Sequence, residues 1–120
     1  MAFENLEVWK RSARLSANIF KSLRDCPDFG FRDQITRSRL SIPSNIAEGM
    51  ERSLPREKRR YLDIAKGSCG ELRTQIYIGM EINHVSKDLG TGWVQETKEI
   101  SAMLVGLIHT LPTADCKLST

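Results

Sequence analysis

Apolar residues recur along the chain at spacings of three and four, which is the period of an α-helix. Four segments show this pattern, at residues 5–24, 31–50, 55–86 and 91–111, and no segment shows a convincing strand pattern. Three short connections separate them, and short connections favour long helices that run antiparallel to their neighbours. The sequence therefore predicts an all-α fold, an antiparallel up-down four-helix bundle.

Capping residues and prolines mark the ends of these helices. Asn5, Asp28 and Ser53 can each cap the helix that follows, because their side chains accept hydrogen bonds from N–H groups of the first turn. Pro55 suits the first turn of the third helix. The run Leu-Gly-Thr-Gly at residues 89–92 predicts the turn that precedes the fourth helix.

The apolar stripes differ in width between the helices. On the first helix we expect the stripe to consist of Leu6, Trp9, Ala13, Ala17, Phe20 and either Leu23 or Arg24. The third helix has a wider stripe, flanked by Ile64 and Ile78, so it is either central in the bundle or also meets another subunit. Gly67, Gly70 and Gly79 lie on this helix, where each costs about 1 kcal/mol relative to alanine. We therefore expect a neighbouring helix to approach closely at these glycines.

Pro43 lies in the middle of the second predicted helix. A proline there removes one backbone hydrogen bond and clashes with the preceding turn. Because the apolar stripe stays in phase across it, we expect a kink at Pro43 rather than a break.

Length and composition fit one small domain. The chain has 120 residues, of which 40% are hydrophobic and 28% charged, which is enough for a single core. We expect this domain to span residues 1–112 and a flexible tail to follow at residues 113–120. The absence of a bilayer-spanning apolar run and of signal-peptide features predicts a cytoplasmic protein without membrane association. Three widely spaced cysteines predict reduced thiols.

No arrangement of residues predicts catalysis, a cofactor or a bound metal. The cysteines and histidines lack the spacing of metal ligands. Cys69 and His84 are 15 positions apart on one predicted helix, about 22 Å along its axis, which is too far for a nucleophile and its base. A weaker alternative is an enzyme built on Cys69 and His109, which lies on another helix. We expect a binding protein that is not an enzyme.

Positive charge is concentrated in the first part of the chain, although the net charge is only +3. Residues 1–75 contain 15 Lys/Arg and 10 Asp/Glu, a balance of +5, whereas residues 76–120 contain 3 and 5, a balance of −2. The densest cluster consists of Arg52, Arg56, Lys58, Arg59 and Arg60, and a second consists of Lys10, Arg11 and Arg14. Such clusters bind nucleic-acid phosphates by Coulomb attraction and counterion release, and a solvated helix face is the equally weighted alternative. The near absence of aromatic residues from the clusters favours backbone contact over base stacking.

The second helix carries a recognisable run, Arg-Ser-Arg-Leu-Ser-Ile-Pro-Ser-Asn-Ile-Ala-Glu-Gly, at residues 37–49. It resembles the hallmark of a bacterial four-helix-bundle family that includes proteins encoded in intervening sequences of the large-subunit ribosomal RNA gene. Residues 3–9, 60–68 and 71–75 match other parts of the family pattern, so the resemblance covers roughly residues 3–111.

The resemblance implies a ring-shaped homopentamer of antiparallel bundles with no enzymatic activity. It also implies relatedness to the accessory protein of diversity-generating retroelements, which binds reverse transcriptase and nucleic acid. For the intervening-sequence members it suggests association with RNA or the ribosome. Within the hallmark run we expect a structural role for Pro43, Ser44, Asn45 and Glu48. Asn45 and Glu48 can satisfy the backbone groups that the proline frees, or pair with Arg52.

Two hypotheses for the function remain. The first is a homopentamer whose basic surface, built from the two clusters, binds the backbone of RNA or DNA without strong sequence preference. The second is a protein-interaction scaffold that docks a partner such as a reverse transcriptase and has no direct role with nucleic acid. Substitution of the cluster at residues 52–60 separates the two.

Overall fold

The structure is a computed structural model, and it describes residues 2–113. A short 3-10 helix, η1 (Phe3–Asn5), precedes four α-helices. These are α1 (Glu7–Leu23), α2 (Phe29–Met50), α3 (Pro55–Glu81) and α4 (Lys87–His109). Within the described residues there is no strand, which confirms the all-α prediction. Nearly all of the predicted tail, residues 114–120, lies outside the described part of the chain.

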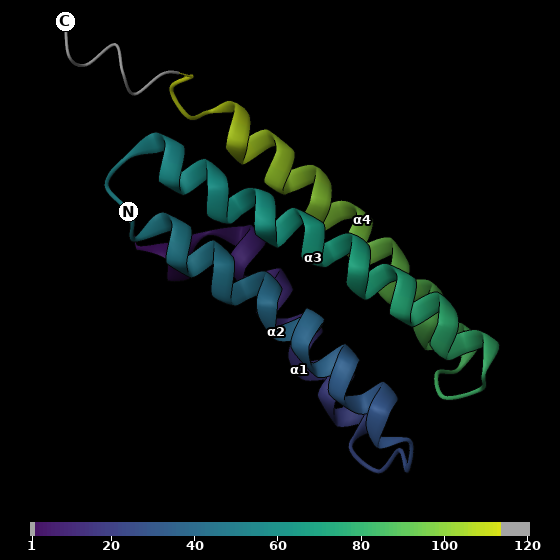
Figure 1. The fold of residues 1–120 in the computed structure, drawn as a ribbon. Coiled ribbons are helices and arrows are strands. Elements are labelled where there is room, and N and C mark those ends of the chain that lie inside the picture. The colour runs from purple at the N-terminus through teal and green to yellow at the C-terminus, as the bar shows by residue number, and fades with distance from the viewer. Residues whose placement is uncertain (1, 114–120) are drawn as a thin grey trace, which may run out of the picture.

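The four helices form one elongated bundle that measures 57 × 22 × 21 Å. α2 packs against α1 and α3, and α4 packs against the same two helices, so α1 and α3 lie diagonally across the bundle. The α1–α2 and α3–α4 connections lie at one end, and the α2–α3 connection lies at the other (Figure 1). α2 is helical without interruption through Pro43, and the kink predicted there stays a prediction.

The residues that precede α1 and α3 differ from the predicted caps, although α3 begins at Pro55 as predicted. Asn5 lies inside η1, and Leu6 is the residue that precedes α1, so Asn5 does not cap this helix. Leu54 rather than Ser53 precedes α3 and gives no side-chain cap. Pro55 occupies the first turn of α3, as predicted, and its fixed φ angle favours helix initiation there.

Asp28 connects the two loops at one end of the bundle. Its Oδ1 accepts a hydrogen bond of 3.0 Å from the backbone N–H of Phe31, which confirms the predicted cap of α2. Its Oδ2 lies 2.9 Å from Nε2 of His84 in the α3–α4 connection. The Phe31 N–H, and to a smaller extent His84, lower the pKa of Asp28 below its ordinary value.

We expect the stabilisation from Asp28 to depend on pH. Because folding lowers the pKa of Asp28, its contribution is complete above the unfolded pKa of about 4 and is lost as the pH falls through the folded pKa. Asp28→Ala should therefore lower the melting temperature at pH 7, and the difference from wild type should shrink as the pH falls below about 4. Thermal denaturation followed by circular dichroism measures this. An equal difference at every pH would show that the charge of Asp28 is irrelevant.

The boundary between α3 and α4 lies earlier in the chain than predicted. α3 ends at Glu81, and Asn83 in the connection has φ +65°, a left-handed conformation that asparagine tolerates. The hydroxyl of Ser86 accepts a hydrogen bond of 3.2 Å from the N–H of Leu89 and caps α4. The prediction of a turn at residues 89–92 is therefore wrong, because these residues belong to the first turns of α4.

α1 buries a different face from the one predicted. Its buried residues are Val8, Ser12, Leu15, Ser16, Ile19 and Leu23. Phe20 of the predicted stripe is 49% exposed, and Trp9 is only partly buried. Both faces contain apolar residues at helical spacing, so periodicity alone does not choose between them. The face with Leu15 and Ile19 packs into the core, which leaves the other apolar face on the surface.

Of the three glycines predicted to allow close helix approach on α3, only Gly79 does so within this chain. A Cβ atom at Gly79 would lie 2.8 Å from Cζ of Phe31 and 2.8 Å from Cγ2 of Val85. A Cβ atom at Gly67 or Gly70 would meet no atom within 4 Å. The prediction is therefore wrong for Gly67 and Gly70 in the single chain.

This contrast predicts opposite effects of alanine at two glycines of one helix. Gly79→Ala should lower the free energy of unfolding by about 1–3 kcal/mol, because the new methyl group overpacks the contact with Phe31. Gly67→Ala should raise it by about 0.5–1 kcal/mol, because alanine favours the helix and has space. Urea denaturation at one fixed protein concentration measures both. Destabilisation by Gly67→Ala would show that another subunit packs on this face of α3.

Candidate nucleic-acid interface

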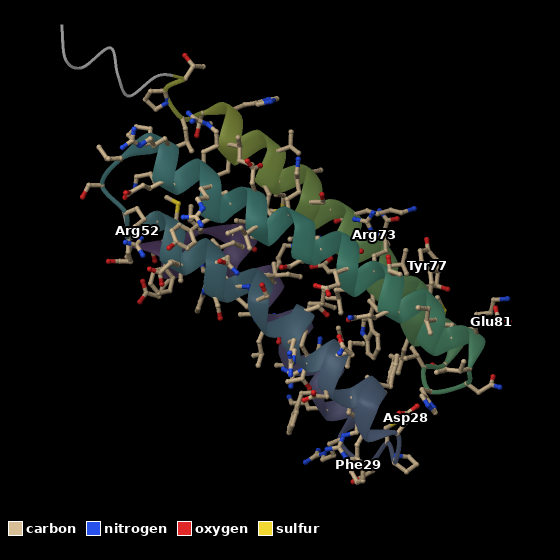
Figure 2. All side chains as sticks on the ribbon, viewed as in Figure 1. Asp28, Phe29, Arg52, Arg73, Tyr77 and Glu81 are labelled. Carbon is tan, nitrogen blue, oxygen red and sulfur yellow. The ribbon has the colours of Figure 1, made fainter. Side chains whose placement is uncertain are left out.

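The predicted basic cluster occupies the α2–α3 connection and the first turns of α3. Figure 2 labels Arg52 at this end of the bundle, whereas Asp28 and Phe29 are labelled at the other end of α2. The structure brings Arg52 and Arg60 together around the ring of Tyr61, at 5.0 and 5.9 Å from its centroid. Two of the five residues of the cluster therefore meet on one aromatic side chain.

Arg52 is held by two partners. Its Nη2 donates to Oε2 of Glu48 at 2.6 Å and to the hydroxyl of Tyr61 at 3.0 Å. Tyr61 first, and then Glu48, raise the pKa of Arg52 above its ordinary value. Its Nε is buried and has no hydrogen-bond partner among the described residues. Arg52 thus has a fixed position, and Glu48 offsets part of its charge.

Lys58 and Arg59 connect the cluster to neighbouring chain ends. Nζ of Lys58 donates to the carbonyl oxygen of Met50 at 3.1 Å, at the C-terminal end of α2. Nη2 of Arg59 donates to the carbonyl oxygen of Pro112, just beyond α4. These two cations stabilise the helix ends, where carbonyl groups lack partners within the helix.

Arg56 and Arg60 are the exposed members of the cluster. They are four residues apart on α3, so their side chains lie on the same face of its first turns. The positive end of the helix dipole lies here too, because α3 begins at Pro55. This face is the part of the cluster that is best placed to contact a phosphate.

Arg11 does not share a surface with its predicted companions Lys10 and Arg14. Its guanidinium donates to Glu96 at 2.6 and 2.9 Å and to Glu99 at 2.5 Å, both on α4. The hydrogen bonds that Arg11 donates to these carboxylates raise its pKa above the ordinary value. Arg11 therefore connects α1 to α4, and two carboxylates offset its charge.

Lys10 and Arg14 are exposed on the outer face of α1. Together with Lys21 they border a shallow surface groove whose floor includes Ala13 and Ala17. Of the second predicted cluster, Lys10 and Arg14 therefore remain as exposed cations on one surface, and Lys21 lies further along the same helix.

The hallmark run makes structural contacts between α2 and α3. The hydroxyl groups of Ser41 and Ser68 are 2.8 Å apart, and Pro43 is buried. Nδ2 of Asn45 donates to the carbonyl oxygen of Ser41 at 2.8 Å and to its Oγ at 2.9 Å. In an α-helix the carbonyl freed by Pro43 belongs to residue 39, so Asn45 does not satisfy it. Glu48 pairs with Arg52, which was one of the two predicted alternatives.

The run ends in glycine because a side chain at position 49 would crowd α3. A Cβ atom there would lie 3.0 Å from Cβ of Tyr61 and 3.2 Å from the carbonyl oxygen of Lys58. α2 and α3 can therefore approach closely only with a residue that has no side chain at this position. The same close approach places Tyr61 beside Arg52.

The weak alternative of a catalytic cysteine receives no support from the site. Cys69 is fully buried, and burial raises the pKa of its thiol to about 12. A thiol with that pKa is protonated at neutral pH and is not an active nucleophile. Among residues 2–113, no three side chains of the metal-binding types gather as a metal site requires. In the same part of the chain, no helix combines the length and apolarity needed to cross a membrane.

Sequence reasoning missed a second group of arginines, at the other end of α2. Arg24, Arg32 and Arg39 line one small cavity between α1 and α2. The available signal was the spacing of Arg32, Thr36 and Arg39, which places them on one face of a helix. Arg24 comes from another helix, and its proximity could not be read from spacing.

The fold and the basic end of the bundle define a small four-helix-bundle protein with a cationic surface. The profile of the family described as 23S rRNA-intervening sequence protein matches residues 4–106, and the chain belongs to this family. This result confirms the resemblance found in the sequence.

A solved structure supports the same fold. It is a protein of unknown function from the S23 ribosomal protein family of Bacteroides thetaiotaomicron. The TM-score is 0.78 at 22% sequence identity, over 84% of this chain and 97% of that one. A search of curated proteins found no match.

Proposed function

We propose that the protein is a non-enzymatic homopentamer that binds the backbone of RNA or DNA through its basic end. The observation that carries the proposal is that Arg56 and Arg60 are exposed on the first turns of α3, at the positive end of its dipole, and that Arg60 shares the ring of Tyr61 with Arg52. Arginine forks match phosphate geometry, and Tyr61 limits the freedom of the neighbouring side chains. The family description names 23S rRNA, so ribosomal RNA is one of the RNAs to test as a ligand.

Exposed apolar residues support the homopentamer. A cyclic ring needs two different surfaces that fit each other on each subunit. α3 exposes Ile64 and Ile78, at 41% and 49%. α1 and α2 form a second apolar surface, a groove of about 520 Å³ that includes Phe20 and Leu40. Contact between these two faces of successive subunits would remove both from water.

A mobility-shift titration of the purified chain with RNA and with DNA tests the proposal. The titration is done at two salt concentrations, and light scattering gives the mass in solution. We expect binding that weakens steeply at the higher salt concentration, from a species about five subunits in mass. Absence of a shift at low salt would rule out the nucleic-acid part, and a monomer mass would rule out the ring.

The apolar groove between α1 and α2 also favours a second candidate, a protein-interaction scaffold. In that case the groove docks a partner protein, such as a reverse transcriptase, and the arginines have no nucleic-acid role. Leu40→Asp would then abolish partner binding, whereas neutralisation of Arg56 and Arg60 would leave it unchanged. If instead neutralisation of Arg56 and Arg60 abolishes binding of nucleic acid and Leu40→Asp leaves it unchanged, the first proposal is supported.

A further inference from the structure

A small cavity lined by three arginines lies between α1 and α2. Arg24 is the residue that ends α1, and Arg32 and Arg39 belong to α2. The cavity has a volume of about 180 Å³, and Phe20 and Thr36 are among its other lining residues. Among the described residues, no carboxylate lines it. The cavity is therefore a concentrated source of positive potential.

Arg39 is a buried cation without a carboxylate partner. Its side chain belongs to a residue that is 8% exposed, and its Nη1 donates to Oγ of Ser16 at 3.1 Å. Within residues 2–113 it forms no ion pair, and burial lowers its pKa from the ordinary value. A buried charge is costly unless an opposite charge compensates it. An anion in the cavity would supply that compensation.

Aromatic rings and a carbonyl group hold the three guanidinium groups in place. The guanidinium groups of Arg39 and Arg24 lie 5.4 and 6.0 Å from the centroid of the Phe20 ring. That of Arg32 lies 5.5 Å from the ring centroid of Phe29, and its Nη1 donates to the carbonyl oxygen of Cys26 at 3.2 Å. These contacts fix the side chains without neutralising their charges.

Asp25, Asp28 and Asp33 are the acidic residues between Arg24 and Arg39 in the chain, and none of them lines the cavity. Asp28 is bonded to His84 and to the Phe31 N–H. Asp33 pairs with Arg37 at 3.5 Å on the exposed side of α2 and lines a neighbouring groove that shares Arg32 and Thr36 with the cavity.

We propose that the cavity formed by Arg24, Arg32 and Arg39, the arginine pocket, binds a phosphate group. Guanidinium groups match phosphate oxygens in pairs, and the hydroxyl of Thr36 can donate another hydrogen bond. At about 180 Å³ the pocket is smaller than the roughly 300–1,000 Å³ typical of larger ligands, so it takes one phosphate group rather than a whole nucleotide. The first half of α2 lines the pocket, whereas Arg52 follows the last residue of α2, so the pocket is separate from the basic cluster. The pocket shares Phe20 and Arg39 with the apolar groove between α1 and α2, and its proposal does not rest on the function proposed above.

Isothermal titration of the full chain with inorganic phosphate and pyrophosphate, at constant ionic strength, tests the pocket. Arg24→Gln and Arg39→Met should each weaken binding by about tenfold or more. The matched control Arg37→Gln removes an equal charge from the same helix, at a side chain that is 74% exposed, and should leave binding unchanged. Absence of binding to the wild-type chain, or equal weakening by Arg37→Gln, would overturn the proposal. Arg24 is exposed, so Arg24→Gln keeps the test valid if Arg39→Met does not fold.

A second titration distinguishes the sources of the phosphate group. Oligonucleotides with a 5′-phosphate and with a 5′-hydroxyl are compared, with and without competing pyrophosphate. If the pocket takes the terminal phosphate of a nucleic acid, the 5′-phosphorylated strand binds more tightly and pyrophosphate removes the advantage. If the two strands bind equally while pyrophosphate still binds, the pocket takes a free phosphate. In the first case Arg39→Met should abolish the advantage of the 5′-phosphorylated strand, and in the second it should weaken the binding of pyrophosphate.

Discussion

The double variant Arg56→Gln/Arg60→Gln should bind RNA and DNA about ten- to a hundredfold more weakly than the wild-type chain at moderate salt. Both residues are exposed on the first turns of α3, so their replacement removes two phosphate-binding side chains per subunit without disturbing the core. The weakening should be similar for different sequences, because phosphate contacts carry no base information. Fluorescence anisotropy with labelled strands of several sequences measures it.

The matched control is Lys87→Gln/Lys98→Gln. These lysines are exposed on α4, and their replacement changes the net charge by the same amount. Affinity should change little, because the removed charges lie away from the start of α3. An equal weakening in both double variants would mean that nucleic acid responds only to net charge. Mass measurements on each variant must show the same assembly as the wild type.

Ile46→Ala should lower the free energy of unfolding by about 2–5 kcal/mol. Ile46 lies in the hallmark run and is 0% exposed, so its truncation leaves a cavity in the core. The measured cost depends on how far the surrounding side chains can close that cavity. Urea denaturation at one fixed protein concentration gives the difference, since any assembly makes stability depend on concentration.

Ser44→Ala provides the comparison within the same run. Ser44 is exposed, so its replacement should change stability by no more than about 0.5 kcal/mol. Together the two variants test whether the hallmark run acts through packing of α2. A large destabilisation by Ser44→Ala would instead show that its hydroxyl group contacts another subunit.

The four helices could be predicted because their apolar periodicity is long and regular, but the caps of α1 and α3 could not. A cap depends on the conformation of one residue, and both Asn5 and Ser53 have suitable side chains at nearly the right place. Glycines at residues 90 and 92 suggested a turn, yet Gly90 lies within α4, and Met80 occupies the space that a side chain at this position would need. That contact joins α3 to α4, so it could not be predicted from the pattern of neighbouring residues in the sequence.

The candidate site was predicted as a cluster of charges, and the structure sorts these charges by their partners. Glu48 and Arg52 could be paired in advance, because four residues separate them on one helix. The pairing of Arg11 with Glu96 and Glu99 joins the first helix to the last, so it requires the packing of α1 on α4. The arginine pocket was missed for the same reason, since Arg24 and Arg39 meet only when α1 packs on α2.

The salt dependence of RNA binding tests the central claim most directly. Binding of one labelled RNA to the wild-type chain and to Arg56→Gln/Arg60→Gln is measured over a series of salt concentrations. The account predicts a steep linear fall of log affinity with log salt for the wild type. For the variant it predicts a slope that is smaller by about one for each phosphate that its side chains no longer neutralise. Equal slopes for the two proteins, or a wild-type affinity that does not change with salt, would contradict it.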